Sequence, residues 1–308
     1  MRDPDWIALA PTLNGPAFER FQRELSRRNG ARLEPLTPSG DWRADVHARA
    51  ALAEAEIAYV ESVRAAIAPF VADIPSDANA FLDWYERLAE NGPGQNDPLF
   101  PWLERFASFE DMKWFLEQEV SGEAGFDDLV ALTQIKMPQT PKLEMARNYW
   151  DEMGRGNAQG MHGPMLTRLA AYFGVDAQPE RVCPESLALG NMMVALASNR
   201  RYAFHSIGAL GAIEMTAPGR AIQVERGLRR LKVPGKQRQY FSLHAILDVK
   251  HSEAWNREVL RPLFEEDPRR AQAIGEGAVL RLWHGARCFE RYRRHFRLQM
   301  EPPREAAA

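Results

Sequence analysis

Residues 239–255 read QYFSLHAILDVKHSEAW and carry the most informative pattern in the chain. His244, Asp248 and His251 stand at positions i, i+4 and i+7 of this stretch, and such positions share one face of an α-helix. Two imidazoles and one carboxylate would be costly on a buried face if nothing bound them. Because neutral imidazole and carboxylate together suit iron, manganese or zinc, the pattern predicts a metal site on a helix.

The composition limits the setting in which such a site would work. The chain has 308 residues, of which 45% are hydrophobic, and this is enough for one large helical domain with a sizeable core. The formal net charge of -3 argues against a general nucleic-acid binder. The cysteines give no disulfide framework and no Cys-rich zinc pattern, and no apolar run is long enough to span a membrane. We therefore expect a cytoplasmic protein with no nucleic-acid and no membrane partner.

Helical patterns dominate the chain, with no βαβ alternation, no strand series and no internal repeat, so the sequence predicts an all-α fold. Residues 1–49 are predicted to be an N-terminal extension packed on a helical domain of residues 50–297, with a disordered tail over 298–308. The periodicity predicts one long helix over 110–134, entered through Ser108. It also predicts a helix over 202–215 that Pro218 and Gly219 close.

Further metal ligands must come from other helices, because di-metal carboxylate proteins draw their ligands from several helices of a bundle. Glu214 stands alone in the apolar run 209–215, which has no basic residue to pair with it. Glu152 closes the aromatic run 148–152, and His162 follows ten residues later. A straight helix would separate these two residues by about 15 Å, so both reach one site only if the chain bends, and three glycines lie between them.

Glu119 and Glu123 compete for one further ligand position. They stand at i and i+4 of the predicted helix over 110–134 and share one of its faces. If that helix and the next are antiparallel around a turn at 136–141, Glu123 lies level with Glu152 and is favoured. Glu119 would lie one turn further along the helix. It would then support the ligands from behind, or it would be a ligand itself if the helix is displaced. Both residues stay candidates.

Each of these signals also has a purely structural interpretation. The His244 triplet could be a solvated helix face with an Asp–His pair, and Glu214 could pair with a distant arginine. Residues 281–297 alternate basic and aromatic side chains, and this pattern favours packing with a solvated basic face over binding an acidic partner. Without a metal site, a structural interpretation would have to hold independently for every candidate ligand. The ordered set of candidates therefore favours a metal site.

The order of the candidate ligands resembles that of the haem-oxygenase-like di-iron oxidases, also called iron-containing redox enzymes. The resemblance covers about residues 110–256 and rests on Glu152-x9-His162, Glu214 and His244-x3-Asp248-x2-His251. The resemblance implies a haem-oxygenase-like helical bundle of about seven core helices that holds two non-haem iron ions. It also implies that these six residues are catalytic metal ligands. By position, Glu152, His162, Glu214 and His244 would hold one iron, and Asp248, His251 and Glu119 or Glu123 would hold the other, with a bridging carboxylate.

The activity that this resemblance implies is that of an O2-dependent non-haem di-iron oxidase or oxygenase. Its substrate would be an amino acid, a fatty acid or a related small molecule, and O2 would be the co-substrate. Tyr149 and Trp150 are predicted to line the substrate pocket, and an external electron donor and a homodimer are further expectations. The alternatives are a mono-iron or di-manganese oxidase on the same ligands, and a ferritin-like iron-binding or non-catalytic helical protein on the same scaffold.

Overall fold

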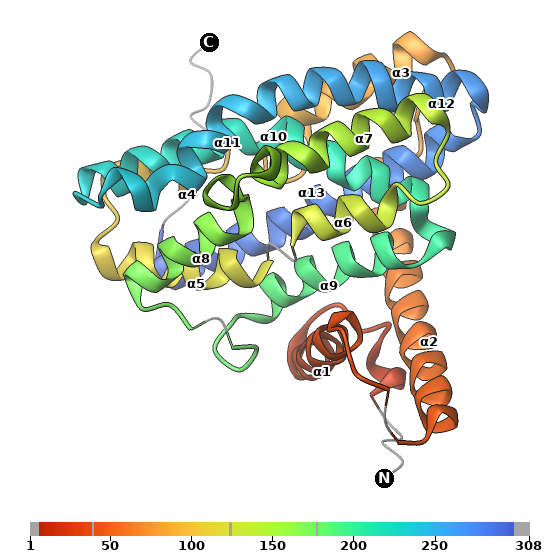
Figure 1. The fold of residues 1–308 in the computed structure, drawn as a ribbon, viewed down its shortest axis with the longest axis horizontal. Coiled ribbons are helices and arrows are strands. Elements are labelled where there is room, and N and C mark those ends of the chain that lie inside the picture. The colour runs from red at the N-terminus through yellow and green to blue at the C-terminus, as the bar shows by residue number, and fades with distance from the viewer. Residues whose placement is uncertain (1–5, 39, 123–124, 177, 299–308) are drawn as a thin grey trace, which may run out of the picture.

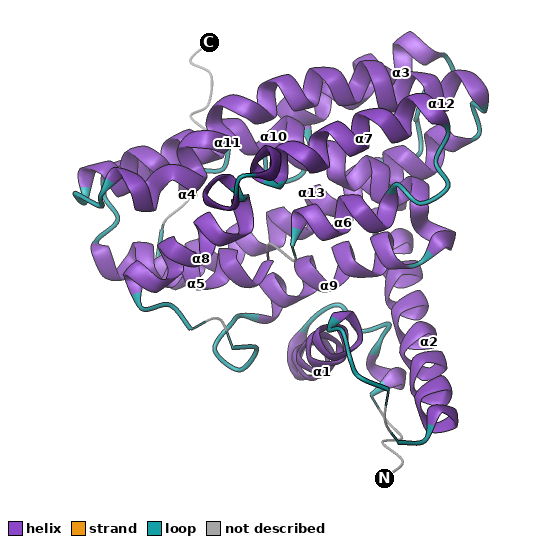
Figure 2. Cartoon of the chain, in the orientation of Figure 1, coloured by secondary structure: helices purple, strands orange, loops and turns teal. Residues whose placement is uncertain are grey.

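The computed structural model describes residues 6–38, 40–122, 125–176 and 178–298, which form helices almost throughout (Figures 1 and 2). These ranges contain no β-strand, and an isolated bridge pairs Met153 with Met161. The predicted all-α class is therefore confirmed. The α-helices are α1 (Gly15–Leu33), α2 (Trp42–Ile67), α3 (Ala78–Asn91), α4 (Leu99–Arg105), α5 (Phe109–Gly122), α6 (Phe126–Thr133), α7 (Gln139–Glu152), α8 (His162–Phe173), α9 (Pro184–Ser198), α10 (Ala203–Arg230), α11 (Gly235–Ala254), α12 (Arg261–Glu266) and α13 (Arg270–Phe296). Short 3₁₀ segments are η1 (Ile7–Leu9), η2 (Ala68–Phe70), η3 (Gly154–Gly156), η4 (Ala158–Gly160) and η5 (Arg200–Tyr202), and the π-helical segment η6 (Trp255–Leu260) joins α11 to α12.

Helix α10 runs through the centre of the bundle and packs against α11, α13, α4 and α9. Its first half crosses α13 with the two backbones in contact. A Cβ atom on Gly208 would lie 1.8 Å from the carbonyl oxygen of Ile274, and one on Gly277 would lie 1.9 Å from that of His205. Because no larger side chain fits at this crossing, the two glycines fix the position of α10 relative to α13.

Pro218 lies inside α10, so the predicted end of this helix at Pro218 and Gly219 is wrong. Proline has no N–H group, so the carbonyl of Glu214, four residues earlier, receives no hydrogen bond from position 218. A proline is tolerated inside a helix when tertiary packing holds both halves, and α10 packs against α11 and α13 over its length. Glu214, a predicted ligand, therefore lies one turn before the proline inside this helix.

The predicted single helix over 110–134 is also wrong, because α5 ends at Gly122 and α6 begins at Phe126. Gly125, just before α6, has φ 70°, a left-handed conformation that an α-helix does not contain. The predicted start is confirmed: Ser108 Oγ accepts a hydrogen bond from the N–H of Asp111 at 3.2 Å, and Asp111 Oδ2 accepts one from the N–H of Ser108 at 2.8 Å.

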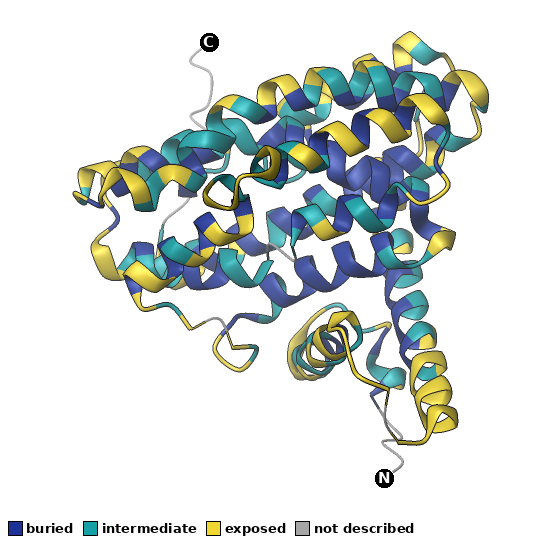
Figure 3. Ribbon diagram, viewed as in Figure 1, coloured by how far each residue is buried: buried dark blue, intermediate teal, exposed yellow. Residues whose placement is uncertain are grey.

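The N-terminal helices lie along the side of the bundle formed by α9 (Figure 1). Helix α1 packs against α9, and α2 contacts both α9 and α13. The first turns of α2 are exposed, whereas Tyr59, Val63 and Ile67 in its second half are fully buried (Figure 3). The boundary expected between residues 49 and 50 falls inside this continuous helix. Residues 299–308 of the expected tail lie outside the described ranges.

Within the described ranges, none of the helices combines the length and the apolar character that crossing a membrane requires.

Glu276 on α13 holds a buried polar network beside the crossing of α10 and α13. Its carboxylate accepts hydrogen bonds from Arg64 Nε at 2.7 Å and Gln272 Nε2 at 3.0 Å, and His205 Nε2 lies 3.0 Å away. Burial raises the pKa of Glu276, but these three donors outweigh it and lower the pKa from its ordinary 4.5 to about 2. The carboxylate form therefore stabilises the fold above pH 4.5, and this contribution is lost as the pH falls toward 2.

Glu276→Gln is expected to lower the free energy of unfolding at pH 7 by about 2–3 kcal/mol, because the change removes the buried carboxylate that Arg64, Gln272 and His205 share. The difference from the unaltered protein should shrink as the pH falls below 4.5. Urea denaturation at several pH values measures both effects. Glu290→Gln is the matched control, since Glu290 lies on the same helix, pairs with Arg294 and is 51% exposed. Equal losses of stability for both variants would contradict the assignment.

Candidate metal centre

Four helices bring six of the eight candidate ligands together in two groups of three. Within each group, one nitrogen or oxygen atom per residue lies within 4.8 Å of the others. Helix α11 supplies three of the residues from one face, as the spacing predicts, while α7, α8 and α10 supply one each. The first group consists of Glu152, His162 and His244, and the second group consists of Glu214, Asp248 and His251.

The chain reverses sharply between Glu152 and His162 and does not continue as a helix. The bend that the sequence predicts here is therefore present. Helix α7 ends at Glu152 and α8 begins at His162, and the bridge between Met153 and Met161 closes the intervening loop. Gly154 in this loop has φ +60°, and a Cβ atom on it would lie 2.4 Å from the carbonyl carbon of Gly160. The loop therefore closes only with glycine at this position, and it brings two distant predicted ligands side by side.

Gly154→Ala is expected to cost about 2–4 kcal/mol of folding stability and to weaken iron binding, because the loop must open to admit the methyl group. Denaturant unfolding and Fe(II) titration of the same variant measure the two effects. Gly163→Ala is the matched control, since a Cβ atom at Gly163 meets nothing within 4 Å. If Gly154→Ala bound iron as tightly as Gly163→Ala, the loop would not be needed to place His162.

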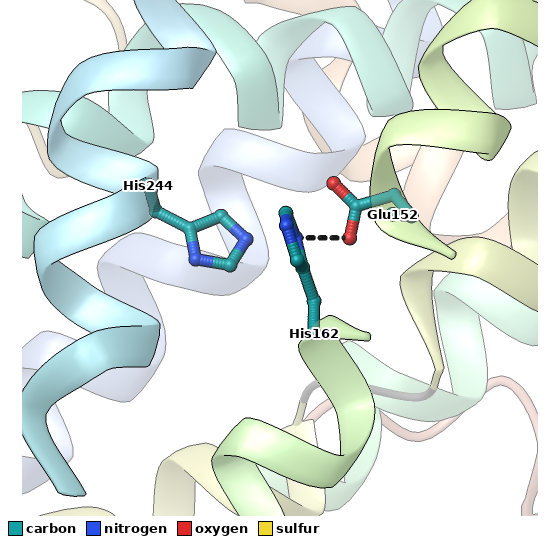
Figure 4. Close-up of side chains that lie close together, drawn as sticks. All are labelled: Glu152, His162 and His244. Atoms are coloured by element: carbon teal, nitrogen blue, oxygen red, sulfur yellow. Dashed lines mark ion pairs between the residues drawn. The ribbon is translucent and has the colours of Figure 1, made fainter. Parts of the chain in front are cut away.

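In the first group the ring of His162 lies between Glu152 and His244 (Figure 4). His162 Nδ1 is 2.6 Å from Glu152 Oε2, and the centroids of the His162 and His244 rings are 4.6 Å apart at an interplanar angle of 72°. His244 Nδ1 is 2.8 Å from the carbonyl oxygen of Tyr240. Since that carbonyl can only accept a hydrogen bond, Nδ1 carries the proton and Nε2 keeps a free lone pair for a metal.

In the second group His251 lies between two carboxylates. His251 Nδ1 is 3.5 Å from Glu214 Oε2, and His251 Nε2 is 3.1 Å from Asp151 Oδ2. The other oxygen of Glu214 accepts a hydrogen bond of 2.5 Å from Asn148 Nδ2. Burial lowers the pKa of His251, but Glu214 and Asp151 outweigh it and raise this pKa to about 9. In the absence of metal a proton therefore holds His251 between the two acids.

The two groups adjoin each other, as their electrostatic effects show. Burial, and next to it the charge of Glu214, raise the pKa of Glu152 well above its ordinary value. Burial and the charge of His251 lower the pKa of His162 to about 4, and burial and His162 lower the pKa of His244 to about 4. Carboxylates thus lie beside carboxylates, and imidazoles beside imidazoles, in one buried volume. Ionised carboxylates crowded in this way are costly unless metal cations bind between them.

The donor atoms fit transition-metal ions. His162 Nδ1 and His251 Nδ1 are both buried and make no hydrogen bond with any described residue, although a carboxylate oxygen faces each of them. A buried polar atom without a hydrogen bond is costly, and a metal ion between imidazole and carboxylate would satisfy both. Each group offers nitrogen and oxygen donors without sulfur, which suits iron or manganese.

Two details of the predicted ligand set differ from the arrangement found. Glu214 lies with Asp248 and His251, whereas the resemblance placed it with Glu152, His162 and His244. Glu119 belongs to neither group: Tyr292 Oη donates a hydrogen bond of 3.2 Å to its Oε1. Glu123 lies outside the described residues. Coordination by Glu119 or Glu123 therefore stays a prediction.

A cavity of about 120 Å³ adjoins both groups, and Glu152, Glu214, His244 and Asp248 form part of its wall. Much of the remaining wall is apolar and comes from residues such as Phe115, Phe126, Leu166, Leu189 and Phe241. A cavity of this size holds a molecule roughly as large as benzene. The predicted lining by Tyr149 and Trp150 is wrong: neither residue belongs to the wall, and Trp150 is 52% exposed.

Four residues that sequence reasoning did not select complete the site. Asp151 and Asn148 on α7 hold His251 and Glu214, and both lie within one turn of Glu152, which is the signal that could have indicated them. Arg220 and Arg281 line the cavity together with Glu119. The prediction of a solvated basic face is therefore wrong for Arg281, the first basic residue of that segment.

Comparison with known families agrees with this site. Residues 113–286, more than half of the chain, match the model of a family described as iron-containing redox enzymes, and the chain belongs to this family. The family suggested by the ligand order is confirmed, and the predictions of iron and of redox chemistry are supported. The matched range includes all six residues of the two groups.

The chain is also similar to a solved structure, a domain of unknown function with a haem oxygenase-like fold from Shewanella denitrificans. The two sequences are 16% identical, the match covers 72% of this chain and 90% of the other, and the TM-score is 0.49. No protein of curated function matches the chain.

Proposed function

We propose that this protein is a non-haem di-iron oxidase or oxygenase that uses O2 to oxidise a small molecule in the cavity beside the two ligand groups. The observation that carries the proposal is the pair of adjoining nitrogen and oxygen donor sets, four of whose residues form part of an otherwise largely apolar cavity wall. A structural zinc site would need one closed set of ligands, whereas two open sets leave positions for O2 and substrate.

The residues around the ligands orient the donor atoms. The carbonyl of Tyr240 fixes the tautomer of His244, and Asp151 does the same for His251 by accepting from Nε2. The amide of Asn148 holds one oxygen of Glu214 and leaves the other toward His251. Iron, when bound, would supply the electrons with which O2 is reduced. The protein's own part is to present imidazole nitrogens and carboxylate oxygens in fixed directions.

The apolar side chains of the cavity exclude water and hold the substrate against the ligand groups. This arrangement suits oxidation of a carbon or nitrogen atom near the metal residues. An amino acid, a short fatty acid or a related metabolite is the substrate class expected from the ligand order. An external electron donor, a homodimer and a cytoplasmic location remain part of the proposal.

Anaerobic Fe(II) titration followed by exposure to O2 tests the proposed function. We expect about two iron ions to bind per chain and O2 to be consumed when they have bound. Manganese offered under the same conditions should bind without consuming O2 at the same rate. Absence of both iron and manganese binding would contradict every metal-based function considered for this chain.

A ferritin-like iron-binding role differs from the proposed one in the same experiment. Iron storage predicts uptake of many more ions than the six residues can hold, whereas an oxidase stops at about two. Binding of two ions without any O2 consumption would favour a non-catalytic iron-binding protein and would reject the oxidase.

A further inference from the structure

Arg220 on α10 is a charged side chain in the cavity wall that the metal ligands do not explain. It belongs to the stripe of α10 that faces the cavity, together with Ile213, Glu214, Ala217 and Val224. It stands six positions after Glu214, so it lies about 9 Å further along the helix axis. Arg220 also lines a second pocket, which contains the exposed residue Asn96, and therefore separates this outer pocket from the cavity.

The guanidinium of Arg220 is held by neutral groups. It lies over the rings of Phe100 and Phe289, at 5.8 Å and 5.4 Å from their centroids, and Nη2 donates a hydrogen bond of 2.7 Å to Thr216 Oγ1. A guanidinium has five N–H donors, so one bond to a hydroxyl leaves most of its capacity unused. Ring faces position such a group and stabilise its charge, but they accept no strong hydrogen bond.

No carboxylate in the described parts of the chain lies within 4.0 Å of the Arg220 nitrogens as an ion-pair partner. Glu119 and Arg281 line the same cavity, and their charges affect the pKa of Arg220 in opposite senses. The lining of the outer pocket includes one acid, Asp97, which pairs with Arg293. Burial first, and Arg281 second, lower the pKa of Arg220 to about 9 despite Glu119, as expected for a cation whose surroundings do not balance it.

We infer that Arg220 binds the carboxylate of the substrate, and that the substrate is a small monocarboxylate whose apolar part lies between Arg220 and the metal ligands. A planar guanidinium binds a carboxylate through two parallel hydrogen bonds, and its partial desolvation strengthens them. The cavity volume of about 120 Å³ and the phenylalanine and leucine walls fit a short aliphatic chain or one aromatic ring. Arg220 and four residues of the ligand groups line the same cavity, so the far end of a molecule bound to Arg220 faces the ligand groups.

This inference rests on the proposed function for the reaction, but binding of the carboxylate is measured without turnover. Benzoate and its neutral analogue benzamide are suitable probes because they have the same size and ring. We expect benzoate to bind the iron-free full-length protein at least ~10-fold more tightly than benzamide, as measured by calorimetry or by thermal shift. Equal binding of the two probes, or binding of neither, would overturn the inference.

Arg220→Met tests the residue itself, since methionine keeps much of the volume between the two rings and removes the charge. We expect this variant to lose the preference for benzoate, by about 10-fold or more, while it still binds about two Fe(II) per chain. Arg226→Met is the matched control, because Arg226 lies on the same helix, is 55% exposed and pairs with Glu104 on the surface. Retention of the full preference in Arg220→Met would also overturn the inference.

The two tests fail in different ways. If the di-iron function were wrong, the unaltered protein would bind no iron or consume no O2, whatever its preference between the probes. If only the substrate class were wrong, iron binding and O2 consumption would be intact and the preference for benzoate would be missing. Arg220→Lys adds a graded result: a retained charge without the planar fork should restore part of the preference.

Discussion

Replacing His251 with alanine is expected to lower the iron content from about two ions to about one per chain and to reduce O2 consumption at least ~100-fold. His251 is the only histidine among the three residues of the second group, and Asp151 orients it through Nε2 at 3.1 Å. Its loss leaves Glu214 and Asp248 as two buried carboxylates without a nitrogen donor. The first group keeps Glu152, His162 and His244 and should still bind one ion.

Iron analysis after anaerobic loading and gel filtration measures the stoichiometry, and an oxygen electrode measures consumption. Lys250→Ala is the matched control, because Lys250 precedes His251 on α11 and is exposed. This control should bind about two ions and consume O2 normally. If His251→Ala also bound two ions with unchanged affinity, then His251 would be a structural partner of Asp151 and no ligand.

The parts of the site that follow helical periodicity could be predicted from the sequence. His244, Asp248 and His251 share one face of α11 because positions i, i+4 and i+7 do so in any α-helix. The reversal between Glu152 and His162 could be predicted because both residues must reach one site and only glycine permits so tight a loop. In both cases the prediction rests on geometry within a short segment of chain.

The features that depend on packing between helices could not be predicted in this way. Pro218 was expected to end a helix, since its effect on an isolated helix is to break it, but contacts of α10 with α11 and α13 hold the helix together. Gly125 interrupts the expected helix over 110–134, and a single glycine is an ambiguous signal in a helical pattern. Arg281 was expected in solvent because its neighbours in the sequence are basic, whereas its position on α13 turns it to the cavity.

The same limit explains the positions of Glu119 and Arg220. The helix that carries Glu119 was predicted to run continuously past the ligands, but after the break it is α6 that packs against α7. Tyr292 from α13 binds Glu119 at 3.2 Å, a contact between residues 173 positions apart that no local pattern contains. A charged cavity wall built from α5, α10 and α13 becomes visible only when the three helices are placed together.

Glu152→Gln is expected to stabilise the iron-free protein and to weaken the stabilisation that iron provides. Glu152 is buried beside Glu214, so removing one negative charge relieves repulsion while the amide keeps the size of the side chain. The gain should be about 1 kcal/mol, which corresponds to a rise of about 1.5 °C in Tm for a chain of 308 residues. In the unaltered protein, each of the two iron ions at about 1,000 times its Kd should stabilise by about 4 kcal/mol, and Glu152→Gln should lose at least about half of the combined effect because an amide is a poor ligand.

Thermal unfolding of both proteins with and without Fe(II), under anaerobic conditions, gives the four Tm values that this prediction needs. Glu144→Gln is the matched control, since Glu144 lies on the same helix, is also buried, pairs with Arg147 and belongs to neither ligand group. Its iron-dependent rise in Tm should equal that of the unaltered protein. The two roles of Glu152 predict different changes in Tm. If Glu152 is only structural, Glu152→Gln lowers the Tm without iron and leaves the iron-dependent rise in Tm intact. If Glu152 is a ligand, the variant has a higher Tm without iron and a smaller iron-dependent rise.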